Sequence, residues 1–346
     1  MKAGMAKNIA AKWVNEIGSK GEGFLGAYIS GSVAELADDE ELLETSDVDI
    51  IVVTGKPVAL KLGKFKYEGI LLEVTHIPQE EFASVEEVLI SHHLANSLKR
   101  NTILGDPTGY LTSLQSQVAK QFAERVWVKR RCRNVLDKIE SSLKGIDTAA
   151  PYYDLVTQWL FPTGITTHVL LLAALRNPTV RRRYQAVKEV LVQYGYEAFY
   201  KELLELLGCM ELSPQSAKIH LQKLERTYDA AVKIARTPFP YSADITARSK
   251  IIAIDGSYQL IEEGYHREAV FWIAATFARC HKILAVDAPA GIQGELLPDF
   301  KNFMLELGIS SVGDIISRSE SVIQFLPELW KVTEDIIDKN PGVITV

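Results

Sequence analysis

Two aspartates stand one residue apart at the start of an apolar run. Asp47 and Asp49 flank Val48, and the chain continues as Ile-Ile-Val-Val. Because side chains alternate between the two faces of a strand, both carboxylates point to one face and Val48 to the other. Such like charges repel unless a cation neutralises them, and Mg²⁺ favours a few carboxylates together with water and substrate phosphate. The spacing therefore indicates a metal site, with two solvated aspartates at a strand end as the alternative interpretation.

A Gly-Ser pair closes the apolar run before these aspartates. Gly31 and Ser32 follow the run at 24–29, and a short helix or loop is expected over 32–43. Glycine lets the backbone come close to a ligand, and amides with a Ser hydroxyl at a helix N-terminus can hold phosphate. The pair is a candidate phosphate-binding turn. The alternative is an ordinary strand-to-helix turn with Ser32 as the N-cap.

A single acid interrupts a third apolar run. Glu73 lies within Ile-Leu-Leu-Glu-Val, in the run at 69–77. An unpaired carboxylate is costly to bury, so Glu73 either faces solvent on an edge strand or has a partner. If this strand lies beside the strand that carries Asp47 and Asp49, Glu73 becomes the third carboxylate of the same cluster.

A small sheet must bring these residues together. Strands are expected at 24–29, 48–53 and 69–77, because these runs are rich in Ile, Val, Leu and Tyr and end at turn residues. An amphipathic helix is expected over 1–18. No strand pattern is found after about residue 83.

Helical patterns fill the rest of the chain. One long helix is expected over 110–143, and 162–164 is expected to break a later helix. Ser213 and Pro214 mark a helix start. The predicted fold class is α+β, with a small mixed α/β domain at 1–110 followed by an all-helical domain at 111–346.

The three motifs follow one another in a particular order. A strand ending in Gly-Ser precedes a strand opening Asp-x-Asp and then a strand with one acid, in ISGSVAEL…SDVDIIVV…ILLEVTHI. This order resembles the nucleotidyltransferase superfamily to which DNA polymerase β belongs. The resemblance covers about residues 24–77 and extends more loosely to about 110 through ILGDPTG. The helical remainder is similar in size and character to the C-terminal domains of aminoglycoside nucleotidyltransferases.

The resemblance implies a role for each of these residues. Gly31 and Ser32 would hold the triphosphate of an NTP, Asp47 and Asp49 would bind one or two Mg²⁺ ions, and Glu73 would complete the metal site or act as a base. It implies transfer of an NMP, with ATP as the expected donor, to a hydroxyl of a small, aminoglycoside-like molecule. Such an in-line displacement depends mostly on positioning and metal electrostatics. Some relatives pair to complete a site, so a homodimer is among the implied arrangements.

The chain departs from many relatives directly after Gly-Ser. Val33, Ala34 and Glu35 follow Gly-Ser without the Arg or Lys that many relatives carry there, and eight acids with no Lys or Arg lie over 35–49. The acidic loop at 35–44 is interpreted as an attractor for a cationic substrate or as a solvated loop. Phosphates would need basic side chains from elsewhere. Two groups are candidates: Lys129, Arg130, Arg131 and Arg133, and Arg181, Arg182 and Arg183.

Two other functions stay open. One is a non-catalytic nucleotide-sensing or antitoxin-like module that binds a protein, which the altered turn after Ser32 favours and the acid triad opposes. The other keeps the chemistry but transfers the NMP to a protein hydroxyl. For a hydroxyl acceptor, Asp255 and Glu268 are candidate bases in the helical domain.

Composition sets the remaining expectations. The 346 residues are 47% hydrophobic and 24% charged, as in a globular protein of about two domains. The net charge of −6 makes nucleic acid an unexpected partner, since phosphate neutralisation favours a basic excess. The sequence shows no signal-peptide pattern and no apolar stretch of ~20 residues, and it has 3 widely spaced cysteines. These observations predict a cytoplasmic protein that does not cross a membrane.

Overall fold

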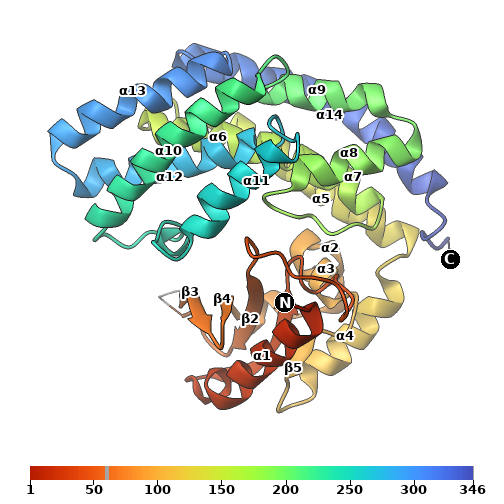
Figure 1. Cartoon of the computed structure of the whole chain (residues 1–346). Coiled ribbons are helices and arrows are strands. Elements are labelled where there is room, and N and C mark those ends of the chain that lie inside the picture. Colours follow the sequence, from red (N-terminus) through yellow and green to blue (C-terminus); the bar gives the residue numbers. More distant parts are fainter. Residues whose placement is uncertain (59–61, 346) are drawn as a thin grey trace. The chain divides into compact units, whose positions relative to one another are not determined.

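The computed structural model describes residues 1–58 and 62–345, which form two compact units (Figure 1). The first unit contains Met1–Arg131, Leu175–Thr179 and Pro341–Val346, and the second contains Cys132–Ala174 and Val180–Asn340. A mixed sheet with helices lies in the first unit and helices make up the second, so the predicted α+β class is confirmed. The domain boundary placed at residue 110 stays a prediction.

The sheet of the first unit has five strands in the order β3-β4-β2-β1-β5. β2 and β4 run parallel, while β1 pairs with β2 and β5, and β3 with β4, in the antiparallel sense. All three predicted strands are present, and β3 and β5 were not predicted. The strands are β1 (Phe24–Ser30), β2 (Val48–Thr54), β3 (Gly63–Tyr67), β4 (Ile70–Pro78) and β5 (Ile103–Gly105).

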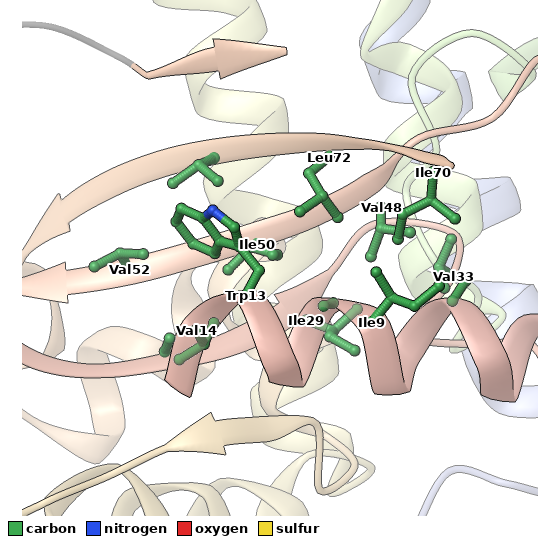
Figure 2. Packing of buried hydrophobic residues seen from close by; sticks show 14 residues of the cluster. Ile9, Trp13, Val14, Ile29, Val33, Val48, Ile50, Val52, Ile70 and Leu72 are labelled. Atoms are coloured by element: carbon green, nitrogen blue, oxygen red, sulfur yellow. The ribbon is translucent and has the colours of Figure 1, made fainter. Parts of the chain in front are cut away.

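Helices cover both faces of this sheet. In Figure 2 the amphipathic helix α1 lies along one face, with Trp13 and Val14 packed against Ile50 and Val52 of β2. On the other face, Tyr28 and Val53 pack with residues of α2, α3 and α4. The helical elements of the unit are α1 (Ala3–Glu16), η1 (Gly18–Lys20), η2 (Gln79–Phe82), α2 (Val85–Ile90), α3 (His92–Leu98), α4 (Tyr110–Gln121) and the start of α5 (Arg125–Lys144).

The long helix expected over 110–143 is wrong, because the chain leaves helical geometry between α4 and α5. The segment near the end of the described chain pairs with this break: the Ile344 amide donates to the Ala123 carbonyl at 2.9 Å, and the Arg125 amide donates to the Ile344 carbonyl at 2.8 Å. These bonds replace helical ones, so a contact distant in sequence interrupts a locally helical pattern.

Among the described residues of the second unit, all regular elements are helices, joined by loops and turns. Ser213 caps the helix that begins at Pro214, as predicted, by accepting from the Ser216 amide at 3.0 Å. Pro162 lies inside a helix that ends two residues later. The elements are α6 (Tyr152–Gly164), α7 (Thr166–Ala173), α8 (Arg183–Tyr194), α9 (Glu197–Leu207), α10 (Pro214–Ile234), η3 (Ser242–Asp244), η4 (Ile251–Asp255), α11 (Gly256–Glu262), α12 (Val270–Asp287), α13 (Ala290–Glu306) and α14 (Val312–Lys339).

One segment of this unit has the length and composition of a membrane span. Among the described residues, Tyr152–Ala173 is 22 residues long and apolar enough, and 78% of its most apolar window is buried inside the protein. Core helices of soluble proteins pass the same test, so the segment is weak evidence for a membrane.

Candidate metal centre

Three predicted site residues meet on one face of the sheet. Asp49 on β2 lies directly beside Glu73 on β4 in the parallel register, and Asp47 immediately precedes β2. Each of the three offers a carboxylate oxygen, and these oxygens lie within 4.8 Å of one another. Glu73 is therefore the third carboxylate of the cluster. The edge-strand interpretation of Glu73 is wrong, since β3 continues the sheet beyond β4.

Gly31 brings the turn after β1 against this cluster. Its φ of +68° lies in the left-handed region, and a Cβ at this position would come within 1.9 Å of Asp49 Oδ2. Only glycine therefore lets the chain turn here beside the Asp49 carboxylate. Ser30, the residue before the turn, lies opposite Asp49 in the β1–β2 register, so the turn and the aspartates belong to one site.

The segment after Gly31 is a series of turns. The Glu35 amide donates to the Ser32 carbonyl at 3.1 Å, and no α-helix begins between Gly31 and β2 in the described chain. The expected helix N-terminus is thus missing from the phosphate turn, and any phosphate contact there falls to the turn amides and to the exposed Ser32 hydroxyl. Val33 fixes the turn by burying its side chain in the core under α1.

The cluster disfavours negative charge on Asp49. Burial raises the pKa of the Asp49 carboxyl well above its usual range, and the carboxylates of Asp47 and Glu73 raise that pKa further. The ammonium of Lys64 acts in the opposite direction. Among the described residues, these three carboxylates and the Lys64 ammonium form a cluster that further positive charge would stabilise.

Lys64 supplies an ammonium to the cluster and is not part of the sequence motifs that predict the site. It lies opposite Glu73 in the β3–β4 register, and its Nζ donates to Asp47 Oδ2 at 2.6 Å and also to Glu73 Oε2. Its side chain is 7% exposed. The signal was the alternation in Gly-Lys-Phe-Lys-Tyr: Phe65 packs towards α1, so Lys64 faces the carboxylates.

The residues of the triad fit a hard divalent cation. Three carboxylate oxygens within 4.8 Å of one another offer the oxygen donors that Mg²⁺ and Mn²⁺ prefer. Asp47 and Glu73 are each 18% exposed at the side chain, so an ion there could keep bound water and reach a substrate.

A second residue that was not predicted supports the turn. Asn177 Nδ2 donates to the Gly31 carbonyl at 3.1 Å, and the Leu175 carbonyl accepts from Lys99 Nζ at 3.4 Å. Both belong to the short segment Leu175–Thr179, which joins the first unit although it follows α7 in the chain. An Asn-Pro pair favours a turn and the end of a helix, and nothing local in the sequence indicates where the Asn177 side chain lies.

The acidic loop at 35–44 is held by basic partners. Lys7 on α1 pairs with Asp38 at 2.9 Å, and Lys99 on α3 pairs with Glu35 at 3.0 Å. The carbonyls of Asp38 and Glu40 accept from the Gly4 and Ala3 amides at 3.0 and 2.8 Å. The loop thereby satisfies two of the free amides at the start of α1.

Several predicted basic residues have structural partners. Arg131 is fully buried and donates to the carbonyls of Leu89 and Phe122 at 3.1 and 2.5 Å, so it is unavailable to a phosphate. Arg183 is 2% exposed, and its guanidinium stacks over Phe271.

The other members of the two basic groups differ in their surroundings. Arg182 pairs with Glu263, and Arg181 donates to the Ile252 carbonyl at 3.4 Å. The guanidinium carbons of Arg130 and Arg133 lie 5.0 and 3.9 Å from the ring centres of Trp127 and Trp330. A phosphate role for Lys129, Arg130 and Arg133 stays a prediction.

The two candidate bases of the helical unit also differ. Glu268 is 4% exposed and accepts from the Tyr200 hydroxyl at 2.6 Å, so its carboxylate is not open to a substrate hydroxyl. Asp255 ends the π-helical turn η4 and is exposed. Of the two, Asp255 alone could reach an acceptor from the surface.

Comparisons with known proteins return little. No protein-family model matches the chain, and no curated protein matches it. Among solved structures, a nucleotidyltransferase-like protein from Exiguobacterium sibiricum 255-15 is 14% identical, and the match covers 75% of this chain and 91% of that one. Its TM-score of 0.29 is too low to support a conclusion about fold or function, so the site residues must carry the functional argument.

Proposed function

We propose that the chain is a Mg²⁺-dependent nucleotidyltransferase that transfers an NMP, with ATP as the donor, to a hydroxyl of a small molecule. One observation carries the proposal: the Asp47, Asp49 and Glu73 carboxylates converge directly beside the Gly31 turn. Transfer at a phosphorus atom needs electrostatic stabilisation and alignment more than a special nucleophile. A carboxylate cluster next to a turn that admits close approach can provide both.

Each residue has a defined task in this proposal. Asp47 and Asp49 hold the metal, and Glu73 is either a third ligand or the base that accepts the proton of the attacking hydroxyl. The bound ion would neutralise charge that develops on the phosphate oxygens. Gly31 keeps the backbone close to the carboxylates, and the exposed Ser32 offers a hydroxyl and an amide to the triphosphate.

The helical domain predicted at 111–346 would select the acceptor. The proposed acceptor is a small molecule of the aminoglycoside kind. Nucleic acid is not an expected partner of a chain with net charge −6. A homodimer that shares a site belongs to the same proposal. Transfer to a protein hydroxyl would keep the metal site and change only the acceptor.

A second candidate is a nucleotide-binding module without catalysis. Lys64 favours it, because this ammonium already pairs with two of the three carboxylates. In that case the acids and Lys64 would form a structural ion cluster, and nucleotide binding would be independent of Mg²⁺.

Calorimetric titration separates these candidates. The wild type and an Asp47→Asn/Asp49→Asn variant are titrated with a non-hydrolysable ATP analogue, with and without Mg²⁺. Binding that requires Mg²⁺ and disappears in the variant supports the proposal. Nucleotide affinity that is the same with and without Mg²⁺, and the same in the variant as in the wild type, favours the non-catalytic module. If ATP, GTP, CTP and UTP analogues all fail to bind, the nucleotide assignment is wrong.

Labelled ATP then identifies the acceptor class. The protein is incubated with a cell lysate and ATP labelled at the α-phosphate, and macromolecules are separated from small molecules. Label on a small molecule supports the proposal, and label on protein identifies a protein hydroxyl instead. The Asp49→Asn variant is the control for labelling by other enzymes in the lysate.

A further inference from the structure

Lys64 is part of the carboxylate cluster. One cross-strand row contains Lys64 on β3, Glu73 on β4 and Asp49 on β2, each paired in register with the next. The ammonium donates to Asp47 at 2.6 Å and to Glu73, so it bridges the two carboxylates that flank Asp49. The Lys64 side chain is 7% exposed, so it is held in place and differs from a mobile surface lysine.

This placement engages the oxygens that a metal would use. Asp47 Oδ2 accepts a hydrogen bond from Lys64, and Glu73 Oε2 accepts another. A divalent ion bound to those atoms would stand a few ångströms from the ammonium, and two positive charges at that range in a half-buried site repel strongly. The metal and Lys64 therefore compete for the same ligands.

We propose that Lys64 is a resident cation of the triad, which must leave Asp47 and Glu73 before a divalent ion can bind them. The free protein then binds metal weakly, and Lys64 sets the metal affinity of the site. The inference uses the proposed function only in treating the triad as a metal site, and it needs neither nucleotide nor catalysis.

Metal binding to the full-length protein tests this directly. Mn²⁺ is titrated by electron paramagnetic resonance into the nucleotide-free wild type and into Lys64→Met. Loss of the competing ammonium is expected to tighten Mn²⁺ binding about tenfold or more. Lys64→Arg, which keeps a cation, is expected to bind as weakly as the wild type. Lys66→Met is the matched control, because Lys66 is exposed two residues along the same strand.

The outcomes separate the inference from its rivals. A folded Lys64→Met variant that binds Mn²⁺ no more tightly than the wild type overturns it. Equal tightening in Lys66→Met also overturns it, because general surface charge would then explain the effect. A Lys64→Met protein that folds only when Mn²⁺ is present supports it, because the metal then replaces the missing ammonium.

A measurement on the wild type covers the case in which the variant does not fold at all. Lysine acetylation by acetic anhydride is followed by peptide mass spectrometry as Mg²⁺ is added. Lys64 reactivity is expected to rise several-fold as the ammonium leaves the carboxylates, while Lys66 stays constant. Metal binding with unchanged Lys64 reactivity contradicts the inference. Neither experiment contains nucleotide, so failure of ATP-analogue binding would reject the proposed function and leave this result intact.

Discussion

The triad and the acidic loop at 35–44 are both rich in carboxylates, yet they differ in how the charge is balanced. In the loop, Asp38 and Glu41 pair with Lys7 and Lys2 close to solvent. In the triad, Asp47 and Glu73 both pair with the half-buried Lys64 ammonium, and Asp49 lies beside them. The loop acids are dense in sequence, whereas the triad acids come from two regions of the chain. Spatial convergence of carboxylates from separate strands in a half-buried position distinguishes the site from the solvated loop.

The two regions also shift carboxyl pKa values in opposite directions. Burial and like charges raise the pKa of Asp49, whereas hydrogen bonding to Lys2 lowers the pKa of Glu41. Lowered values mark acids whose charge stabilises the fold. The raised pKa of Asp49 marks a carboxyl group whose negative charge destabilises the fold, and such groups are common at binding and catalytic sites.

Asp49→Asn should give the largest effect on activity. We expect nucleotidyl transfer to fall about a thousandfold or more, because the substitution removes one of the carboxylates proposed to hold the metal. The fold should remain intact, since the amide occupies the same volume and relieves repulsion in the cluster. Steady-state kinetics with a labelled NTP and circular dichroism measure both. Full activity in a folded variant would remove Asp49 from the mechanism.

Gly31→Ala should come next. A left-handed backbone costs an alanine about 1–2 kcal/mol, and the methyl group would also displace the Asp49 carboxylate. We expect lower stability and a loss of transfer of about a hundredfold. Gly109→Ala is the matched control: its φ is +74° and no atom lies within 4 Å of its added Cβ. If both variants lose activity equally, the contact between Gly31 and Asp49 is irrelevant.

Asn177→Ala should have an intermediate effect. The variant loses the hydrogen bond to the Gly31 carbonyl, a contribution of about 1 kcal/mol. We expect kcat/KM for the NTP to fall about tenfold, with KM carrying most of the change because the turn is less well fixed. Kinetics over a range of NTP concentrations test this, and a fall in stability with unchanged KM would indicate a purely structural role.

The pH dependence of stability should differ between the two regions. In EDTA, the folded state binds the Asp49 proton more tightly than the unfolded state, so the free energy of unfolding should fall as pH rises above about 4. The charges facing Asp49 are Asp47, Glu73 and Lys64. Urea unfolding from pH 4 to 7.5 should therefore show a shallower fall for Asp49→Asn than for the wild type.

The contribution of Glu41 to stability should change with pH in the direction opposite to that of Asp49. Its lowered pKa makes its contribution to stability grow as pH rises through the carboxyl range, so Glu41→Gln should steepen the net fall. Identical slopes in the wild type, Asp49→Asn and Glu41→Gln would contradict the proposed electrostatic difference between the regions.

Asp38→Asn should give the smallest effect. Its partner is Lys7, and the Asp38 side chain is 80% exposed, so solvent and salt screen the pair. We expect the melting temperature to change by less than about 2 °C and transfer activity to stay within about twofold. A large loss of activity would revive the interpretation of the loop as an attractor for a cationic substrate.

The strands that carry the site could be predicted because their signals are local. Alternation places Asp47 and Asp49 on one face, and apolar runs mark β1, β2 and β4. That the strand carrying Glu73 lies beside the strand of Asp49 could be predicted only conditionally, since strand order is a long-range property. The sequence also could not distinguish Arg131, which is buried between backbone carbonyls, from the basic residues around it.

Other features escaped prediction for definable reasons. β3 is short and carries two lysines, so its pattern is weak for a strand, and Lys64 was missed with it. The break between α4 and α5 contains neither Gly nor Pro and depends on Ile344. Asn177 reaches Gly31 only through tertiary structure. Each missed feature requires a partner far away in the sequence.

The pairing of Ile344 with the break after α4 bears on how the protein is made. A chain emerging from the ribosome folds domain by domain from its N-terminal end. Here the sheet unit takes in Leu175–Thr179 and Pro341–Val346, which are synthesised during and after the helical unit. The sheet unit therefore lacks some of its own residues until nearly all the helices of the second unit have been synthesised. The pairing of Ile344 with Ala123 and Arg125 is therefore a late step, because it joins residues that are synthesised before and after the helical unit.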